Sequence, residues 1–223
     1  MKEPVTYDSL KALHRQSRGT IPDALSLRIH RALSWLKRAN LEPDDHDARF
    51  LFLWIGFNAA YALPNEDRKQ FPETRQFLTF IERLVRLDRD GLLYEILWDS
   101  LPGPLRLLLD NPHAFRPYWQ YCQGLISEQD WQQAFNRSRA ASNRALGNMD
   151  TRKALAILFD RLYVIRNQLV HGGSTWNSSI NRDTLQHACA LLERLLPATL
   201  LIMMQNPHQS WGRVAWPVEP DSS

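Results

Sequence analysis

One short segment combines the residue types that can move protons and hold phosphate without a metal ion: Val164-Ile-Arg166-Asn167-Gln-Leu-Val-His171-Gly-Gly. Histidine can accept or donate a proton near neutral pH. Arginine offers a preorganised fork to phosphoryl oxygens, and asparagine can orient the phosphate or the imidazole. Such a set suits cleavage of RNA by its own 2′-hydroxyl. That reaction requires a proton taken from the hydroxyl, a proton given to the departing 5′-oxygen, and stabilisation of the added negative charge.

The spacing of an arginine and a histidine with four to six residues between them is not unique in this chain. It recurs at Arg106 to His113 and at Arg182 to His187. Among 22 arginines and seven histidines, about two such spacings are expected by chance. The first recurrence straddles an Asn-Pro break. The second has Asp183 after its arginine and lies near the start of a predicted helix. Only Arg166 to His171 has the asparagine and closes a long amphipathic helix, so this segment is the preferred candidate.

On these residues the sequence resembles the HEPN family, whose members are all-α domains and in many cases metal-independent endoribonucleases. The family motif is Arg-x(4–6)-His with a polar residue after the arginine, which Arg166, Asn167 and His171 match. The segment from Arg49 to Tyr61 is similar to an aromatic helix found in some bacterial HEPN proteins, and it contributes Asn58 as a supporting residue. The resemblance covers residues 23–206, with a long unmatched middle region.

The resemblance implies catalytic roles for Arg166, Asn167 and His171, no cofactor and no metal. It also implies RNA as substrate, a homodimer with a composite active site, and a role as a toxin or phage-defence effector with a neutralising antitoxin partner. Two alternatives stay open. One is a catalytically silent HEPN-type module that binds RNA, a nucleotide or a protein. The other, less favoured, is a helical transcription regulator, for which no helix-turn-helix with a basic recognition helix is evident.

Geometry gives an independent reason to expect two copies. On an ideal helix, residues five apart differ by about 140° in direction and about 7.5 Å in height. A single helix therefore does not aim Arg166 and His171 at one point. Two copies related by a twofold axis can surround one cleft with both pairs.

Further residues are candidates for contact with RNA bases and phosphates. Tyr163 and Trp176 flank the motif and can stack on bases. The polar stretch 136–144 carries Arg137, Arg139 and Arg144. Every candidate also has an ordinary structural role open to it: packing for the aromatic residues, a solvated face or a surface ion pair for the arginines, and the helix dipole for a C-terminal histidine. For Asn58 that role is a hydrogen bond to a backbone carbonyl.

Leucine, alanine, arginine and glutamine dominate, glycine is scarce, and β-branched runs are nearly absent, which predicts an all-α, HEPN-like bundle with extra helices in its middle. We expect a polar arm at 1–22, one domain at 23–206 and an extended tail rich in Trp and Pro at 207–223. Apolar spacing predicts helices at 23–40, 46–63, 75–88, 91–98, 105–110, from 127, 151–171 and 182–205. The expected N-caps are Asp23, Asp44 or Asp45, Ser127 with Asp130 in a capping box, Asp150 and Asn181. Pro197 predicts a kink, and 46–63 is expected to be the central helix.

Composition limits the partners and the cellular location that we expect for the protein. The net charge is +3, but 22 of 27 basic residues are arginine, which permits a nucleic-acid partner. The apolar run Leu195–Met204 is about half the length of a membrane helix, and the N-terminus lacks a signal sequence, so we expect no membrane association. Cys122 and Cys189 are expected to be packed, reduced thiols in a cytoplasmic protein. No metal-ligand pair, glycine-rich phosphate loop or nucleophile elbow is present.

Overall fold

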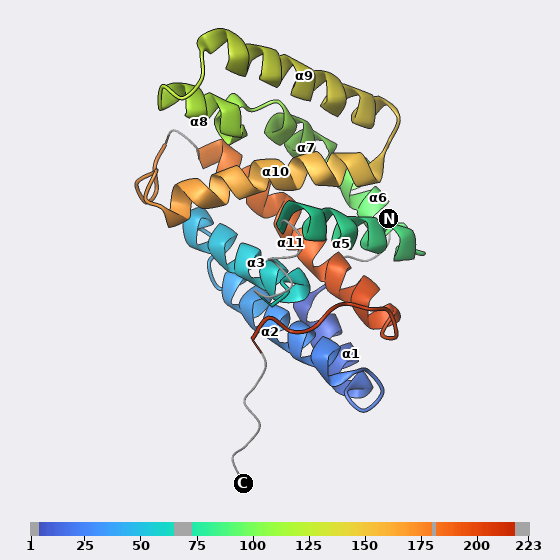
Figure 1. Ribbon diagram of the computed structural model, residues 1–223. Coiled ribbons are helices and arrows are strands. Elements are labelled where there is room, and N and C mark those ends of the chain that lie inside the picture. Colours follow the sequence, from blue (N-terminus) through green and yellow to red (C-terminus); the bar gives the residue numbers. More distant parts are fainter. Residues whose placement is uncertain (1–4, 65–72, 180–181, 217–223) are drawn as a thin grey trace.

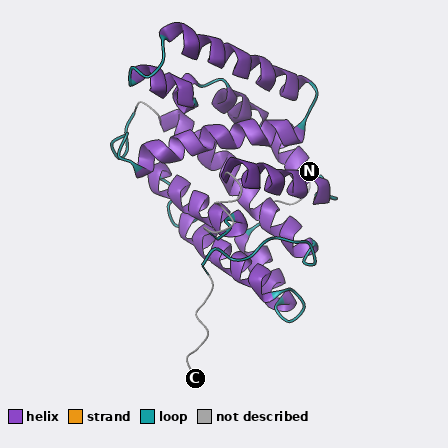
Figure 2. Ribbon diagram, viewed as in Figure 1, coloured by secondary structure: helices purple, strands orange, loops and turns teal. Residues whose placement is uncertain are grey.

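Helices are the only regular secondary structure in residues 5–64, 73–179 and 182–216, the parts of the chain that the computed structural model describes. Figure 2 shows the absence of strands throughout these parts. The predicted all-α class is therefore confirmed. Its physical basis is the composition, because leucine, alanine, arginine and glutamine lose little side-chain freedom in a helix.

The first three helices are α1 (Tyr7–Ser17), α2 (Asp23–Ala39) and α3 (His46–Tyr61). They gather at one end of the molecule (Figure 1). Within the region expected to be a polar arm, α1 packs against α2 and α11 and buries Leu10 and His14. Helix α2 has Pro22 at its N-cap, without a side-chain cap, so the expectation that Asp23 caps it is wrong. Asp23 is instead the first helical residue, where a carboxylate interacts favourably with the helix dipole.

The middle of the chain is built from shorter pieces. These are α5 (Glu73–Leu87), α6 (Leu92–Tyr94) running into a π-helical turn (Glu95–Ser100), α7 (Pro102–Leu109), a 3₁₀ turn (Pro112–Ala114) and α8 (Arg116–Cys122). Proline stands in the first turn of α7, the 3₁₀ turn and α8. Its fixed φ suits that position and its missing N–H is no loss there, so these prolines start helices as well as separating them.

Three long helices complete the fold: α9 (Glu128–Gly147), α10 (Thr151–Val170) and α11 (Arg182–Gln205). The capping box of Ser127 and Asp130 is confirmed, and so are the caps by Asp45 and Asp150. The predicted cap Asn181 lies outside the described residues. Helix α11 continues through Pro197.

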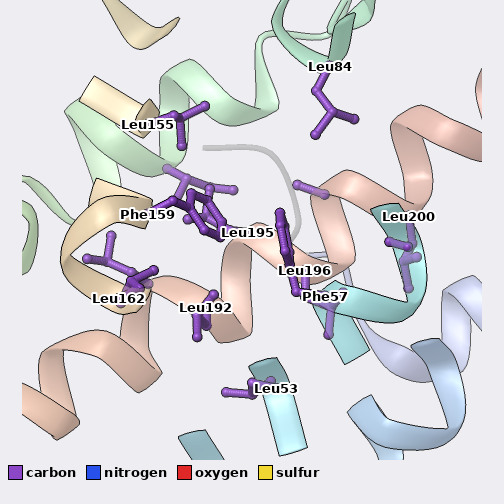
Figure 3. Close-up of a cluster of buried hydrophobic side chains, with 14 of the residues drawn as sticks. Leu53, Phe57, Leu84, Leu155, Phe159, Leu162, Leu192, Leu195, Leu196 and Leu200 are labelled. Atoms are coloured by element: carbon purple, nitrogen blue, oxygen red, sulfur yellow. The ribbon is translucent and has the colours of Figure 1, made fainter. Parts of the chain in front are cut away.

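The core forms where α3, α5, α10 and α11 meet (Figure 3). It contains Leu53, Phe57, Leu84, Leu155, Phe159, Leu162, Leu192, Leu195, Leu196 and Leu200, all at most 3% exposed. The most central helix is α11, because it packs against α1, α2, α3, α5 and α7. Helix α3, expected to be central, leaves Ile55 36% exposed. By length and composition α11 alone among the described helices is long and apolar enough to cross a membrane, but 72% of its most apolar window is buried inside the protein, as in a core helix.

The chain beyond α11 returns across the bundle. Trp211 is buried against Phe80, and its indole N–H donates to the carbonyl of Asn206 at 2.9 Å. Arg83 also donates to the carbonyl of Ser210. The tail is therefore fixed to the domain as far as the arginine at 213, whose carbonyl accepts a hydrogen bond from α2.

Candidate functional site

Arg166 of the candidate motif lines a pocket of about 430 Å³ between α2, α3, α10 and the returning tail. We call it the arginine pocket. The residues around it that matter for ligand binding are Arg28, Arg31, Trp54, Asn58, Tyr163, Arg166 and Trp216. In Figure 1, α10 crosses the molecule beside α3, which brings residues more than 100 positions apart into one site.

The arginine pocket is strongly cationic. Three guanidinium groups line it, those of Arg28, Arg31 and Arg166, and no Asp or Glu is among its described lining residues. Arg166 donates from its Nη1 to the side-chain oxygen of Asn167 at 2.9 Å, a neutral partner. Neither Arg31 nor Arg166 has an ion pair with any residue that the structure describes. Like charges gathered without compensation favour an anion as the missing partner.

Arg28 combines this charge with burial, being only 1% exposed. It donates to the carbonyls of Ala60 at 3.1 Å and of Arg213 at 2.6 Å, so it ties the tail to the end of α3. Its Nε–H is buried and has no hydrogen-bond partner among the described residues. Burial, and secondly the charge of Arg31, lower the pKa of Arg28 to about 10, which still leaves it charged at neutral pH.

Asn58 and Tyr163 line the same pocket as Arg166, each half-buried. The side-chain amide of Asn58 makes no hydrogen bond to another described residue, so both its donor and its acceptor are available to a ligand or to water. Tyr163 packs edge-on against Trp54 with ring centroids 6.2 Å apart, and the guanidinium of Arg116 lies 5.7 Å from its ring centre. Tyr163 is thus held in place as part of the pocket wall.

His171 does not line the arginine pocket. It is the C-cap residue of α10, its backbone N–H donates to the carbonyl of Asn167 at 3.0 Å, and its side chain is exposed. Gly172 follows with φ of 69°, a left-handed conformation that ends the helix there. Within one chain the fold therefore brings Arg166, Asn167, Asn58 and Tyr163 together, and it leaves the histidine outside.

The other RNA-contact candidates lie elsewhere. Trp176 is 73% exposed in the loop after α10, and its indole N–H donates to Asp45 at 3.0 Å. Arg137, Arg139 and Arg144 are exposed on α9, which lies across α10 from α3 (Figure 1). Arg139 forms an ion pair with Asp110. None of these four residues is among the described residues that line the arginine pocket.

The residues of the two competing motifs, Arg182 to His187 and Arg106 to His113, make contacts within the fold. Arg182 forms an ion pair with Asp47 at 2.9 Å, and the imidazole Nδ1 of His187 is hydrogen-bonded to the backbone carbonyl of Asp183. The backbone carbonyl of His113 accepts hydrogen bonds from the side chains of Trp119 and Gln168. The arginine at 182 is therefore compensated by a carboxylate, whereas Arg166 is not.

Arg28 and Arg31 are functional candidates that motif reasoning alone missed. A signal was present in the sequence. Arg28 lies three residues after Leu25 and four before Ala32, so helical periodicity already placed a permanent cation at a position facing the core. An arginine there requires compensation from elsewhere in the fold, and Arg31 follows on the next turn.

Metal ligands and thiols add no second site in the described residues. They contain no group of three His, Cys, Asp or Glu side chains placed to hold an ion. Cys122 is exposed, contrary to the expectation that both cysteines are packed, whereas Cys189 is buried and its pKa is raised to about 12 by that burial.

Comparison with known proteins adds no assignment: the chain matches no family model, no curated protein and no solved structure.

Proposed function

We propose that the protein is a HEPN-type, metal-independent endoribonuclease in which Arg166 binds the scissile phosphate and His171 transfers protons. The observation that carries the proposal is the set of three arginines, without a carboxylate among the described lining residues, that surrounds Arg166 of the motif. A phosphodiester supplies the negative charge that this pocket lacks. Of the two arginines whose motifs lie in long helices, Arg166 is the one not neutralised by an ion pair.

In the proposed reaction, a basic imidazole takes the proton of the 2′-hydroxyl and the 2′-oxygen attacks the adjacent phosphorus. The bond from phosphorus to the 5′-oxygen breaks, and an imidazolium returns a proton to that oxygen. The products are a 2′,3′-cyclic phosphate and a 5′-hydroxyl end. Arg166, oriented by Asn167 at 2.9 Å, stabilises the additional negative charge of the five-coordinate state.

The position of His171 requires a second copy for this chemistry. The imidazole lies at the exposed end of α10, outside the pocket that holds Arg166. In a twofold dimer that pairs the ends of two α10 helices, one copy's histidine approaches the other copy's arginine, and two histidines become available as acid and base. Light scattering at micromolar concentration should therefore show a dimer, and a strict monomer would contradict the composite site.

The decisive experiment incubates a mixed RNA pool with the wild type and with variants, followed by end-group analysis for cyclic phosphate. His171→Ala should lose about a hundred- to ten-thousand-fold in rate, as expected for removal of a general acid–base. Arg166→Ala should lose activity through the absent phosphate fork, and Arg166→Lys should restore it only in part, since lysine lacks that fork. Activity should survive excess chelator because the mechanism uses no metal.

The matched control is His187→Ala, which removes the histidine of the Arg182 motif and should cleave like the wild type. If His187→Ala is inactive and His171→Ala is active, the wrong motif has been assigned. If the wild type cuts no RNA while the arginine pocket still binds an anion, the function is the second candidate, a catalytically silent HEPN-type binding module. That candidate is favoured by one observation: His171 is not among the residues that line the arginine pocket in a single chain.

A toxin or phage-defence role in the cytoplasm, restrained by a neutralising antitoxin, belongs to the same proposal and follows from the resemblance alone. Expression of the wild type should then arrest growth of a host cell. Expression of His171→Ala at the same level should not.

A further inference from the structure

A second pocket, of about 230 Å³, adjoins the arginine pocket. The two pockets share three lining residues, Trp54, Tyr61 and Tyr163. Beyond these, the second pocket is bordered by Phe77 and Phe159, and we call it the aromatic pocket. Together the two volumes fall in the range of about 300–1,000 Å³ that is usual for small-molecule sites.

The walls of the aromatic pocket are flat rings held by one another. The rings of Phe77 and Phe159 have centroids 4.9 Å apart, and Tyr61 meets Phe77 edge-on at 5.3 Å. Trp54 meets Tyr163 edge-on at 6.2 Å on the side shared with the arginine pocket. Rings fixed in this way lose little freedom when a ligand enters. They offer the apolar faces on which a nucleobase packs, whatever its sequence.

The charges of the two pockets differ in a way that orients a ligand. The carboxylate of Asp160 lines the aromatic pocket, whereas the arginine pocket has three arginines and no described carboxylate. A phosphate is attracted by Arg31 and Arg166, whereas the aromatic pocket has one arginine, Arg116, and one carboxylate, Asp160, which is paired with Arg161. A base, by contrast, presents N–H groups that a carboxylate accepts. Arg116, which also lines the aromatic pocket, lies over the ring of Tyr163.

From this arrangement we infer that the joined pockets bind one nucleotide, with its unpaired base in the aromatic pocket and its phosphate against Arg31 and Arg166. The inference extends the proposed function by naming the substrate class, RNA with an unpaired base beside the bound phosphate. It requires binding only and no cleavage. A free nucleotide and an unpaired nucleotide within a strand share this chemistry, and duplex RNA does not, because its bases are stacked and paired.

The test is calorimetric titration of the full chain with four probes: guanosine 5′-monophosphate, guanosine, inorganic phosphate and a short single-stranded RNA. The RNA arm uses the His171→Ala variant, so that strand cleavage does not consume the probe. The nucleotide should bind at least about tenfold more tightly than either guanosine or phosphate alone, since it fills both pockets. If only the RNA strand binds, the ligand is a nucleotide within a strand. If the free nucleotide binds as well, the site accepts both sources.

Two variants separate the pockets. Arg31→Ala removes a cation with no described ion-pair partner and should weaken nucleotide binding about tenfold or more, the loss expected for a charged hydrogen bond. Leu78→Trp places a larger ring at the 39% exposed edge of the aromatic pocket and should block the nucleotide while inorganic phosphate binds as before. Arg15→Ala, an exposed arginine on α1 that lines neither pocket, is the charge-matched control and should bind like the wild type.

The inference is overturned if neither the nucleotide nor the single-stranded RNA binds more tightly than inorganic phosphate, or if Arg15→Ala weakens binding as much as Arg31→Ala. Thermal unfolding of each variant checks that it is folded, and phosphate binding by Leu78→Trp is a second check. Nucleotide binding by a protein that cleaves no RNA would refute the proposed function alone. Cleavage by a protein that binds neither the nucleotide nor the single-stranded RNA at least about tenfold more tightly than inorganic phosphate would refute the inference alone.

Discussion

A close approach between helices in the core lies at Gly56 in the middle of α3, and it provides a measurable test of the packing. A Cβ atom built there would lie 2.8 Å from Cδ2 of Leu196 on α11, and 3.4 Å from both the carbonyl oxygen of Ala32 and Cβ of Trp35 on α2. Gly56 therefore allows three helices to meet closely. Leu196 is 0% exposed, so its methyl group has no free space into which to move.

Two opposing effects decide the result of Gly56→Ala. Alanine in a helix interior is favoured over glycine by about 1 kcal/mol. Overpacking of a dense core costs about 1–3 kcal/mol. Because the closest atom belongs to a fully buried side chain, the second effect should be larger, and the free energy of unfolding should fall by about 1 kcal/mol. Urea unfolding followed by circular dichroism measures this change, with an unchanged m-value as the sign of an unaltered fold.

Two controls make the prediction sharp. Gly147→Ala changes another helical glycine, at the end of α9, where an added Cβ meets nothing within 4 Å, and it should stabilise the protein. In a Leu196→Val background the Cδ2 methyl that would clash with the new Cβ is absent, so Gly56→Ala should become neutral or stabilising. If Gly56→Ala stabilises the wild-type background as much as Gly147→Ala does, the close approach of α3 to α11 is not as described.

Two further predictions concern buried titratable groups. Cys122 should react with a thiol reagent in the folded protein at neutral pH, whereas Cys189 should react only after unfolding, as counted by mass spectrometry. Burial raises the pKa of Cys189 to about 12, so its contribution to stability is complete below the unfolded thiol value near 8.5 and is lost as pH rises towards 12. Burial, and secondly neighbouring cationic side chains, lower the pKa of His14, which is 0% exposed. Its contribution is therefore present above the unfolded value near 6.5 and lost as pH falls below it, and His14→Gln should flatten the decline of Tm on acidification. A Tm that declines as steeply in His14→Gln as in the wild type would contradict that assignment.

Sequence reasoning succeeded where the determining interactions are local. The caps at Asp45, Ser127 and Asp150 depend on a side chain and a backbone N–H three residues away, which the sequence alone specifies. It did not predict α8. That helix buries none of its residues and contacts α9 through rings such as those of Tyr118 and Trp131, so it lacks an apolar period.

For the candidate site, too, the sequence predicted what depends on a local pattern and missed what depends on distant residues. The assignment of Arg166 as a site residue came from a local pattern, and the fold places it in a cationic pocket. The contribution of Arg28 could not be foreseen in full, because its partners Ala60 and Arg213 are 32 and 185 positions away. The position of one copy's His171 relative to the other copy's Arg166 depends on how two chains pack together. The structure of a single chain does not give it, and it stays a prediction.

Two buried arginines, Arg161 and Arg28, differ in how their charge is compensated, and this difference supports the arginine pocket as the candidate site. Arg161 is 0% exposed, but it is compensated by Asp160 at 3.3 Å, by the hydroxyl of Ser138 at 2.6 Å and by the ring of Phe115. It serves to hold α9 onto α10. Arg28 is equally buried, yet among the described residues it donates hydrogen bonds to backbone carbonyls alone, and two more uncompensated arginines share its pocket. A buried cation without a counter-ion costs several kcal/mol unless an anion arrives. The Nε–H of both arginines is buried without a hydrogen-bond partner among the described residues, so what separates them is the counter-ion: Arg161 has Asp160, and Arg28 has none. The surroundings of Arg28 therefore favour a negatively charged ligand.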